Sequence, residues 1–163
     1  MQFLTIFLTI IYMVYFTLTI VLFLIESFDL NKVTVLFLLI ICISSDIGGY
    51  VFGKIIGGKK LTKISPNKTY AGLFGSIILS LIIGYLFHSL NYDILVTKMN
   101  LFFFIIIISL ISQIGDLIIS IFKRMASIKD TGSFLPGHGG ILDRFDGILL
   151  SIPLGIILFN IFL

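Results

Sequence analysis

The sequence is poor in charged residues and in cysteine. Only 12% of the 163 residues are Asp, Glu, Lys or Arg, about half of the roughly 25% that is usual in soluble domains. Together with a mean hydropathy of +1.20, this shortage indicates that much of the chain lies in a lipid bilayer. The single cysteine, Cys42, excludes an intrachain disulfide, and its position in an apolar run predicts a packed core residue.

Other absences exclude further classes of protein. The first 25 residues have no basic n-region and no small-residue cleavage site, which favours a retained transmembrane helix over a signal peptide. The net charge of +3 does not predict nucleic-acid binding, because the basic residues fall in short loops between apolar runs. The run Gly57–Lys60 is not a Walker A motif, because its surroundings are wrong.

Five apolar runs are long enough to cross a membrane, which takes about 20 residues in a helix. They cover approximately residues 3–25, 33–52, 71–90, 101–122 and 141–163. Runs of this length without strict alternation favour helices over strands. The predicted fold is therefore an all-α polytopic integral membrane protein with about five transmembrane helices.

The basic residues sort to one side of the predicted membrane. Nine of the eleven Lys and Arg residues lie in or beside the loops that follow the second and fourth runs, whereas Lys32 and Lys98 occupy the other two loops. The positive-inside rule makes the first side cytoplasmic. The N-terminus is then expected in the cytoplasm and the C-terminus outside.

Two acidic residues lie inside apolar runs. Asp46 precedes Lys54 by eight residues and Asp116 precedes Lys123 by seven, so each lies roughly 10–12 Å from the basic end of its helix. A carboxylate in a membrane helix costs about 2.5 kcal/mol or more to insert and usually faces a polar cavity. We therefore predict that both acids line one cavity that opens to the cytoplasm.

The stretch "SQIGDLIISIFKR" predicts a polar helix face around Asp116. Ser112, Asp116 and Ser120 follow one another at intervals of four residues, and Gln113 and Lys123 lie close to the same face. The alternative is a structural ion pair between Asp116 and a Lys or Arg of another helix. Spacing alone leaves both interpretations open.

Two further acids, Asp143 and Asp146, lie three residues apart near the start of the last run and are expected on one helix face. Like charges at this spacing repel each other unless a cation lies beside them. Carboxylate oxygens without thiolates suit a hard cation, so Mg²⁺ or Mn²⁺ fits better than zinc. The alternative is an acidic first turn that complements the helix dipole.

The preceding loop, "GSFLPGHGG", is typical of a phosphate-binding segment. Glycines let the backbone approach a ligand closely, and N–H groups ahead of a helix attract anions. His138 could donate a hydrogen bond to phosphate, with metal ligation as the alternative. Four basic side chains stand around this loop: Lys123, Arg124, Lys129 and Arg144. Acids for a metal and bases for phosphates together predict phosphoryl or nucleotidyl chemistry at the membrane.

A second loop on the same side contains "KISPNKTYAG". A turn is expected after Ser65, and Thr69 could cap the next helix. Lys68 could meet an anion at the interface. The other lysines of this loop are explained as solvated charges that follow the positive-inside rule.

The stretch "SIFKRMASIKDTGSFLPGHGGILDRFDG", Ser120–Gly147, resembles the signature of the phosphatidate cytidylyltransferase, or CDP-diacylglycerol synthase, family. The family pattern S-x-x-K-R-x4-K-D-x-G, then P-G-H-G-G and D-R-x-D, is filled at every position. Earlier segments "SDIGGYVFGK", "SPNKTYAG" and "QIGD" resemble family segments in the same order, so the resemblance covers about residues 40–163. Family members usually carry more hydrophobic helices ahead of this part, which suggests a short or N-terminally truncated member.

The resemblance implies an enzyme that transfers a cytidylyl group from CTP to phosphatidic acid and releases pyrophosphate. It implies Mg²⁺ as the cofactor, with K⁺ as a candidate second ion. The implied metal ligands are Asp116 and Asp143, to which the spacing argument adds Asp146. Catalysis is expected to depend on Asp116, Asp143, Lys123 and Arg144.

The resemblance also implies a set of substrate-binding residues. Ser65, Lys68 and Thr69 match the loop that meets the substrate phosphate, and Asp46 and Asp130 match acids of the family. The remaining positions suit the phosphates of CTP: Arg124, Lys129, His138, Gly139 and Gly140, beside Lys123 and Arg144.

These interpretations define the expected organisation. Residues 1–32 form an N-terminal transmembrane helix with its outer loop, and residues 33–163 form a CDP-diacylglycerol synthase-like catalytic membrane domain. The expected partners are CTP, phosphatidic acid and membrane lipid but not nucleic acid, and a homodimer is left open. The site is expected to face the cytoplasm from the bacterial inner membrane. Competing functions are a CTP-dependent lipid kinase, an ether-lipid cytidylyltransferase and a cation transporter that uses Asp46 and Asp116.

Overall fold

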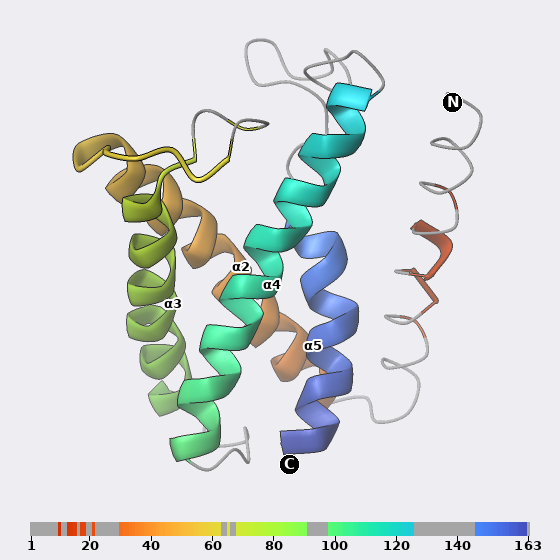
Figure 1. Ribbon diagram of the computed structural model, residues 1–163. Helices are drawn as coiled ribbons and strands as arrows, with labels where there is room; N and C mark the ends of the chain where they lie inside the picture. The colour runs from red at the N-terminus through yellow and green to blue at the C-terminus, as the bar shows by residue number, and fades with distance from the viewer. Residues whose placement is uncertain are drawn as a thin grey trace, which may run out of the picture.

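The computed structural model describes residues 10, 13–15, 17–18, 21, 30–62, 65, 68–90, 98–125 and 146–162. Apart from separate helical residues before position 22, this part of the chain forms four helices. They are α2 (Leu30–Ile55), α3 (Tyr70–Leu90), α4 (Lys98–Met125) and α5 (Ile148–Phe162), arranged as a bundle (Figure 1).

Three of these helices contain a segment long and apolar enough to cross a membrane: Lys32–Ile55, Tyr70–Leu90 and Asn100–Met125. The apolar part of α5, Ile148–Phe159, is shorter. The described part of the chain is therefore helical and typical of a polytopic membrane protein, as predicted. Most of the run at 3–25 lies outside the described residues, so the expected total of five membrane helices stays a prediction.

Helices α2 and α4 are longer than the apolar runs that predicted them. Each begins three residues earlier and ends three residues later than its run. The added turns carry charged residues such as Lys32, Lys54 and Arg124, which are exposed. Long basic side chains can extend to the polar interface while their backbone stays helical, so hydropathy underestimates the helix length.

The start of α5 corrects one prediction. Asp146 and Gly147 form a turn ahead of α5, which begins at Ile148 beside the middle of α4 (Figure 1). The prediction that Asp146 lies on a helix face is therefore wrong. This turn packs closely against α4, because a Cβ atom at Gly147 would lie 2.5 Å from Ser112 Oγ and 2.9 Å from the Ser112 carbonyl oxygen. Asp143, its expected neighbour on that face, lies outside the described residues.

An apolar core joins α2, α4 and α5 where α2 and α4 begin and α5 ends. The Phe104 ring stacks on Phe37 with centroids 6.2 Å apart and meets Phe159 edge-on at 6.0 Å. Cys42 is buried at the edge of this core, and its Sγ lies 2.9 Å from Ser151 Oγ. The prediction of a packed core cysteine is confirmed.

Small residues let the backbones of α2 and α3 approach each other closely. A Cβ atom on Gly48 would lie 2.6 Å from the carbonyl oxygen of Gly75, and one on Gly72 would lie 2.7 Å from that of Gly49. Figure 1 shows the two helices converging towards the end at which α2 finishes and α3 begins. Close backbone approach at small residues is typical of membrane helix pairs.

A layer of serine hydroxyls separates the apolar core from the opposite end of the bundle. Ser45 Oγ of α2 lies 3.0 Å from Ser109 Oγ of α4, and Ser80 Oγ of α3 donates to Ser109 Oγ at 3.4 Å. All three side chains are buried. Hydrogen bonds between membrane helices contribute on average about 0.6 kcal/mol each, so this layer fixes the three helices against one another beneath the site described next.

Candidate active site

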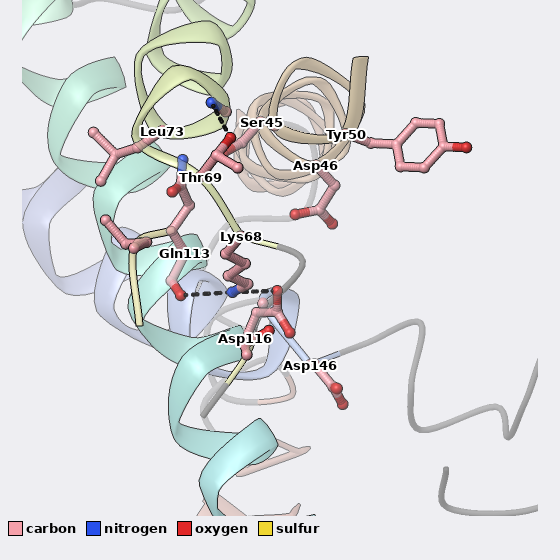
Figure 2. Close-up of a pocket in the computed structure, with 14 residues that line it drawn as sticks. Ser45, Asp46, Tyr50, Lys68, Thr69, Leu73, Gln113, Asp116 and Asp146 are labelled. Carbon is pink, nitrogen blue, oxygen red and sulfur yellow. Dashed lines mark hydrogen bonds and ion pairs between the residues drawn. The ribbon is translucent and has the colours of Figure 1, made fainter. Parts of the chain in front are cut away.

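One cavity of about 400 Å³ opens above the serine layer and is lined by residues of α2, α3 and α4, of the loop between α2 and α3, and of the turn ahead of α5. This volume lies in the range of roughly 300–1,000 Å³ found for small-molecule sites. Asp46 of α2 and Asp116 of α4 both line it, which confirms that the two acids share a cavity. The polar residues that line it are Ser45, Asp46, Tyr50, Ser65, Lys68, Thr69, Gln113, Asp116 and Asp146 (Figure 2).

Asp116 is ion-paired across the cavity. Lys68 Nζ, from the loop ahead of α3, lies 2.5 Å from Asp116 Oδ2 and donates to the carbonyl oxygen of Gln113 at 3.4 Å (Figure 2). Both sequence interpretations of Asp116 therefore apply, because the acid lines the cavity and also holds a lysine. The contact ties the loop to α4 and places the Lys68 ammonium inside the cavity.

Asp146 forms a second ion pair with a lysine. Lys123 Nζ, near the end of α4, lies 2.6 Å from Asp146 Oδ2. The side chains of this pair are 13% and 5% exposed, against 21% and 35% for Lys68 and Asp116, so the Lys123–Asp146 pair is the more desolvated. Removing one partner of a buried pair is costly because it leaves the other charge uncompensated.

A pair of glycines brings Asp146 to α4. A Cβ atom on Gly115 would lie 3.2 Å from the carbonyl oxygen of Asp146, and Gly147 is in similarly close contact with Ser112. Side chains at these two positions would push the turn away from α4. The absence of side chains at Gly115 and Gly147 thus allows an acid that lies 30 residues further along the chain to enter the same cavity as Asp116.

Asp46 differs from the other two acids. It is exposed on α2, and in Figure 2 its carboxylate points towards the Lys68–Asp116 pair. Among the residues that the structure describes, no lysine or arginine lies within ion-pair distance of Asp46. Three acids thus face one cavity while two described lysines are bound to them.

The loop between α2 and α3 is folded against the cavity. Gly57 and Gly58 have φ values of +64° and +94°, which suit glycine and end α2. An isolated bridge then joins Lys60 to Thr69. The Lys68 N–H donates to the Ser65 carbonyl oxygen at 3.1 Å, which confirms the turn expected after Ser65.

Thr69 caps α3, as the sequence predicts. Its Oγ1 accepts a hydrogen bond from the Gly72 N–H at 3.1 Å, which satisfies one of the free donors of the first turn. The cap holds the Thr69 side chain at the cavity wall. It also fixes the end of the segment that carries Lys68.

Replacing Thr69 by valine should therefore lower the stability of the purified protein by about 0.5–2 kcal/mol, whereas serine should retain it. Thermal unfolding in detergent measures the difference. Valine keeps the shape and loses the hydroxyl, while serine keeps the hydroxyl. Equal melting temperatures for the two variants would show that the cap does not stabilise α3.

Other expected site residues lie elsewhere. Arg124 is exposed at the end of α4, and Ser112 and Ser120 are not among the described residues that line the cavity, so the predicted polar face narrows to Gln113 and Asp116. Ser112 is buried because it packs on Gly147. Seven predicted residues lie outside the described part: Lys129, Asp130, His138, Gly139, Gly140, Asp143 and Arg144.

Two polar residues of the cavity wall, Ser45 and Tyr50, and the glycine Gly147 carried no predicted role in the site, whereas Gln113 was expected beside Asp116. The Gln113 amide donates a hydrogen bond to Ser76 Oγ on α3, so it links α4 to α3 beside the cavity. Tyr50 follows Asp46 by four residues, a spacing that could have placed it on the same helix face. For Ser45 and Gly147 the sequence offers no comparable signal.

Within the described residues, no group of three or more His, Cys, Asp or Glu side chains is arranged to hold a metal ion. Asp116 and Asp146 nevertheless face the same cavity. Their carboxylate oxygens are the donor type that hard divalent cations prefer. The donor chemistry fits Mg²⁺, whose use by this chain stays a prediction.

These features define a class of membrane protein with a polar, charged cavity set among apolar helices. The sequence model described as "Cytidylyltransferase family" matches residues 1–162. The chain belongs to this family.

Curated relatives carry a more specific name. A Staphylococcus epidermidis protein called phosphatidate cytidylyltransferase is 43% identical over 121 residues, which cover 74% of this chain and 46% of the relative. Proteins with the same name from Staphylococcus haemolyticus and Bacillus subtilis are 46% and 40% identical, over 68% and 79% of this chain and 42% and 48% of the relatives. The chain thus spans about half the length of the curated relatives it matches.

Proposed function

We propose that this chain carries the cytidylyl-transfer site of a phosphatidate cytidylyltransferase, which converts CTP and phosphatidic acid into CDP-diacylglycerol and pyrophosphate. The observation that carries the proposal is the cavity in which Asp46, Asp116 and Asp146 meet Lys68 among membrane helices. Such a mixture of acids and bases suits a metal–phosphate ligand. The names of the relatives supply the substrates.

The reaction requires little of the protein beyond positioning and charge stabilisation. A phosphate oxygen of phosphatidic acid attacks the α-phosphorus of CTP and forms the new P–O bond. The bond between the α-phosphorus and its bridging oxygen to the β-phosphate breaks, and pyrophosphate leaves with the electron pair. Because the phosphate nucleophile is already anionic, no side chain has to act as a strong base.

The residues of the chain take three roles in this proposal. Asp116 and Asp146, with Asp143 beyond the described part, would hold Mg²⁺, and K⁺ is a candidate second ion. When bound, the divalent cation would neutralise charge on the phosphates. Lys68 and Lys123 would bind phosphate oxygens, joined by Arg124, Lys129, His138 and Arg144 from the end of α4 and the segment after it. Ser65, Thr69 and Asp46 would form the wall that receives the substrate head group.

The location of the site follows from charge. The cavity lies towards the end of the bundle that carries Lys54, Lys59, Lys60 and Arg124, all exposed. By the positive-inside rule this end would face the cytoplasm of the bacterial inner membrane. CTP would then reach the cavity from the cytoplasm while the acyl chains of phosphatidic acid stay in the bilayer. The expected topology has the N-terminus inside and about five transmembrane helices.

The test is an assay of the detergent-purified chain with CTP, phosphatidic acid and Mg²⁺. We expect CDP-diacylglycerol and pyrophosphate in equal amounts. Release of CDP with a phosphorylated lipid would instead identify a lipid kinase, and preference for an ether lipid would identify the other cytidylyltransferase class. Ion flux into liposomes without CTP, and no lipid product, would favour a transporter. Because the chain spans about half of its relatives, the same assay on a full-length relative provides the positive control.

A further inference from the structure

The charged groups of the cavity, taken with Lys123, which pairs with Asp146 without lining the cavity, almost balance before any ligand enters. Asp116 holds Lys68 at 2.5 Å and Asp146 holds Lys123 at 2.6 Å. These carboxylates are the described groups proposed above to hold a divalent cation. The lysines are groups proposed to hold phosphate. The acids proposed to bind the cation are therefore ion-paired with the lysines proposed to bind phosphate.

The third acid leaves a net negative charge. Asp46 lines the same cavity, and within the described residues it forms no ion pair. Its carboxylate is directed at the Lys68–Asp116 pair (Figure 2). A cation that approaches Asp46 therefore comes next to a carboxylate whose present counter-ion is a movable side chain.

The two pairs share one helix. Asp116 and Lys123 are both on α4 and seven residues apart, which corresponds to about two helical turns or 10 Å along one face. An ammonium group on a flexible four-carbon stem can turn from one partner to another by side-chain rotation. The geometry thus permits exchange of partners by side-chain rotation alone.

We propose that Lys68 and Lys123 are exchangeable counter-ions, which neutralise Asp116 and Asp146 until a divalent cation and a nucleoside triphosphate enter together, and then bind the phosphate oxygens. The inference rests on the proposed function, because it assigns ligands to the same cavity. It specifies that the nucleotide binds as a metal–nucleotide complex. The cation of this complex then replaces the lysines beside the carboxylates, and its phosphates replace the carboxylates beside the lysines.

The physical reason is the cost of an unpaired charge. A divalent cation that bound alone would separate both ammonium groups from their carboxylates without offering them another anion, and a nucleotide that bound alone would separate both carboxylates from their ammonium groups. Uncompensated charges of this kind are strongly unfavourable. Joint binding satisfies all four groups. Cation and nucleotide should therefore increase each other's affinity, and by linkage the factor must be the same in both directions.

The test is equilibrium binding in detergent by calorimetry, with Mn²⁺ as the cation and CTP as the nucleotide, each alone and both together. In the unmodified chain, we expect each ligand to raise the affinity for the other about 5- to 150-fold beyond their association in solution. Lys68→Met and Lys123→Met should each raise the affinity for Mn²⁺ alone at least about fivefold and weaken the coupling. Lys68→Arg, which keeps the charge, should leave the affinity for Mn²⁺ low.

Lys54→Met is the matched control, because Lys54 is exposed and contacts the Tyr50 ring without lining the cavity. It should leave the affinity for Mn²⁺ unchanged. Lys68→Gln and Lys123→Gln repeat the measurement of Mn²⁺ affinity with neutral polar side chains. The result therefore does not depend on whether the methionine variants fold. The proposal is overturned if the neutral variants bind Mn²⁺ no better than the unmodified chain, or if CTP leaves the affinity for Mn²⁺ unchanged.

The binding experiment is independent of product formation. If the unmodified chain makes no CDP-diacylglycerol yet the neutral lysine variants bind Mn²⁺ more tightly and coupling is present, the counter-ion exchange stands and the proposed activity fails. If product forms but the lysine variants do not change Mn²⁺ binding, the activity stands and the exchange is wrong.

Discussion

Gly48→Ala should destabilise the protein strongly, whereas Gly49→Ala, one residue further along the same helix, should not. The added Cβ at position 48 would lie 2.6 Å from the Gly75 carbonyl oxygen and 2.9 Å from the Ser76 Cα. Both neighbours are backbone atoms, so no side chain can rotate away. At position 49 the nearest atoms would be 3.8 and 3.9 Å away, which is ordinary contact.

The two substitutions have the same intrinsic effect on a helix, since alanine is favoured over glycine by about 1 kcal/mol. Any difference between them therefore reports packing. We expect a loss of about 3 kcal/mol for Gly48→Ala, at the upper end of the range for overpacked interiors, and a neutral or slightly stabilising effect for Gly49→Ala. Thermal unfolding in detergent measures both.

The functional consequence is separable from stability. α2 carries Asp46 and α3 follows Lys68, so forcing these helices apart widens the cavity between them. Gly48→Ala protein that remains folded at low temperature should therefore bind nucleotide more weakly than Gly49→Ala protein. Equal melting temperatures for the two variants would contradict the close α2–α3 contact.

The sequence predicted the shared position of Asp46 and Asp116 because helical rise converts spacing into depth. Both acids precede a basic helix end by similar numbers of residues, and rigid helices preserve that relation in the bundle. The Thr69 cap was equally predictable, since it depends on the three residues that follow it. Local rules, and depth along a helix, were sufficient for these features.

Other features depend on contacts that no local pattern encodes. The pairing of Lys123 with Asp146 requires the turn at Gly147 to lie against α4, which depends on two small residues 32 positions apart. The partner of Asp116, Lys68, belongs to a loop, whereas the sequence predicted only that an ion-pair partner would be some lysine or arginine of another helix. Ser45 lines the cavity while its hydroxyl is bound to Ser109 of α4, which in turn accepts a hydrogen bond from Ser80 of α3. These residues are specified by the tertiary arrangement of the bundle.

The ion pairs also explain why the acids were ambiguous in the sequence. A buried carboxylate paired with lysine and a carboxylate awaiting a metal ion have the same sequence signature, an acid in an apolar run. In this cavity, Asp116 and Asp146 are both paired with lysine and proposed to bind the metal ion. A variant that removes only charge, and keeps shape, is needed to separate the structural contribution of Asp116 from its contribution to the reaction.

Asp116→Asn should reduce the rate of CDP-diacylglycerol formation by about 10²–10³-fold, the size of effect seen when one preorganised electrostatic group is removed from an active site. Asparagine has nearly the same shape and cannot supply an anionic oxygen to a cation. The fold should survive, because the Lys68 ammonium keeps its contact with the Gln113 carbonyl oxygen and the pair is partly exposed. We expect a stability loss of no more than about 1 kcal/mol.

The double variant Asp116→Asn with Lys68→Met separates the two roles of Asp116. The comparison is with Lys68→Met alone, because Lys68 is itself proposed to bind phosphate. If the acid only balances the charge of Lys68, the double variant should be as active as Lys68→Met, because no uncompensated charge remains in it. If Asp116 contributes to binding the metal–nucleotide complex, the double variant should be clearly less active than Lys68→Met although its melting temperature recovers. We expect the second outcome, since Asp116 lines the cavity beside Asp46 and Asp146 whether or not Lys68 is bound to it. A double variant as active as Lys68→Met alone would reduce Asp116 to a structural ion pair and would leave Asp146 and Asp46 as the described acids for the reaction.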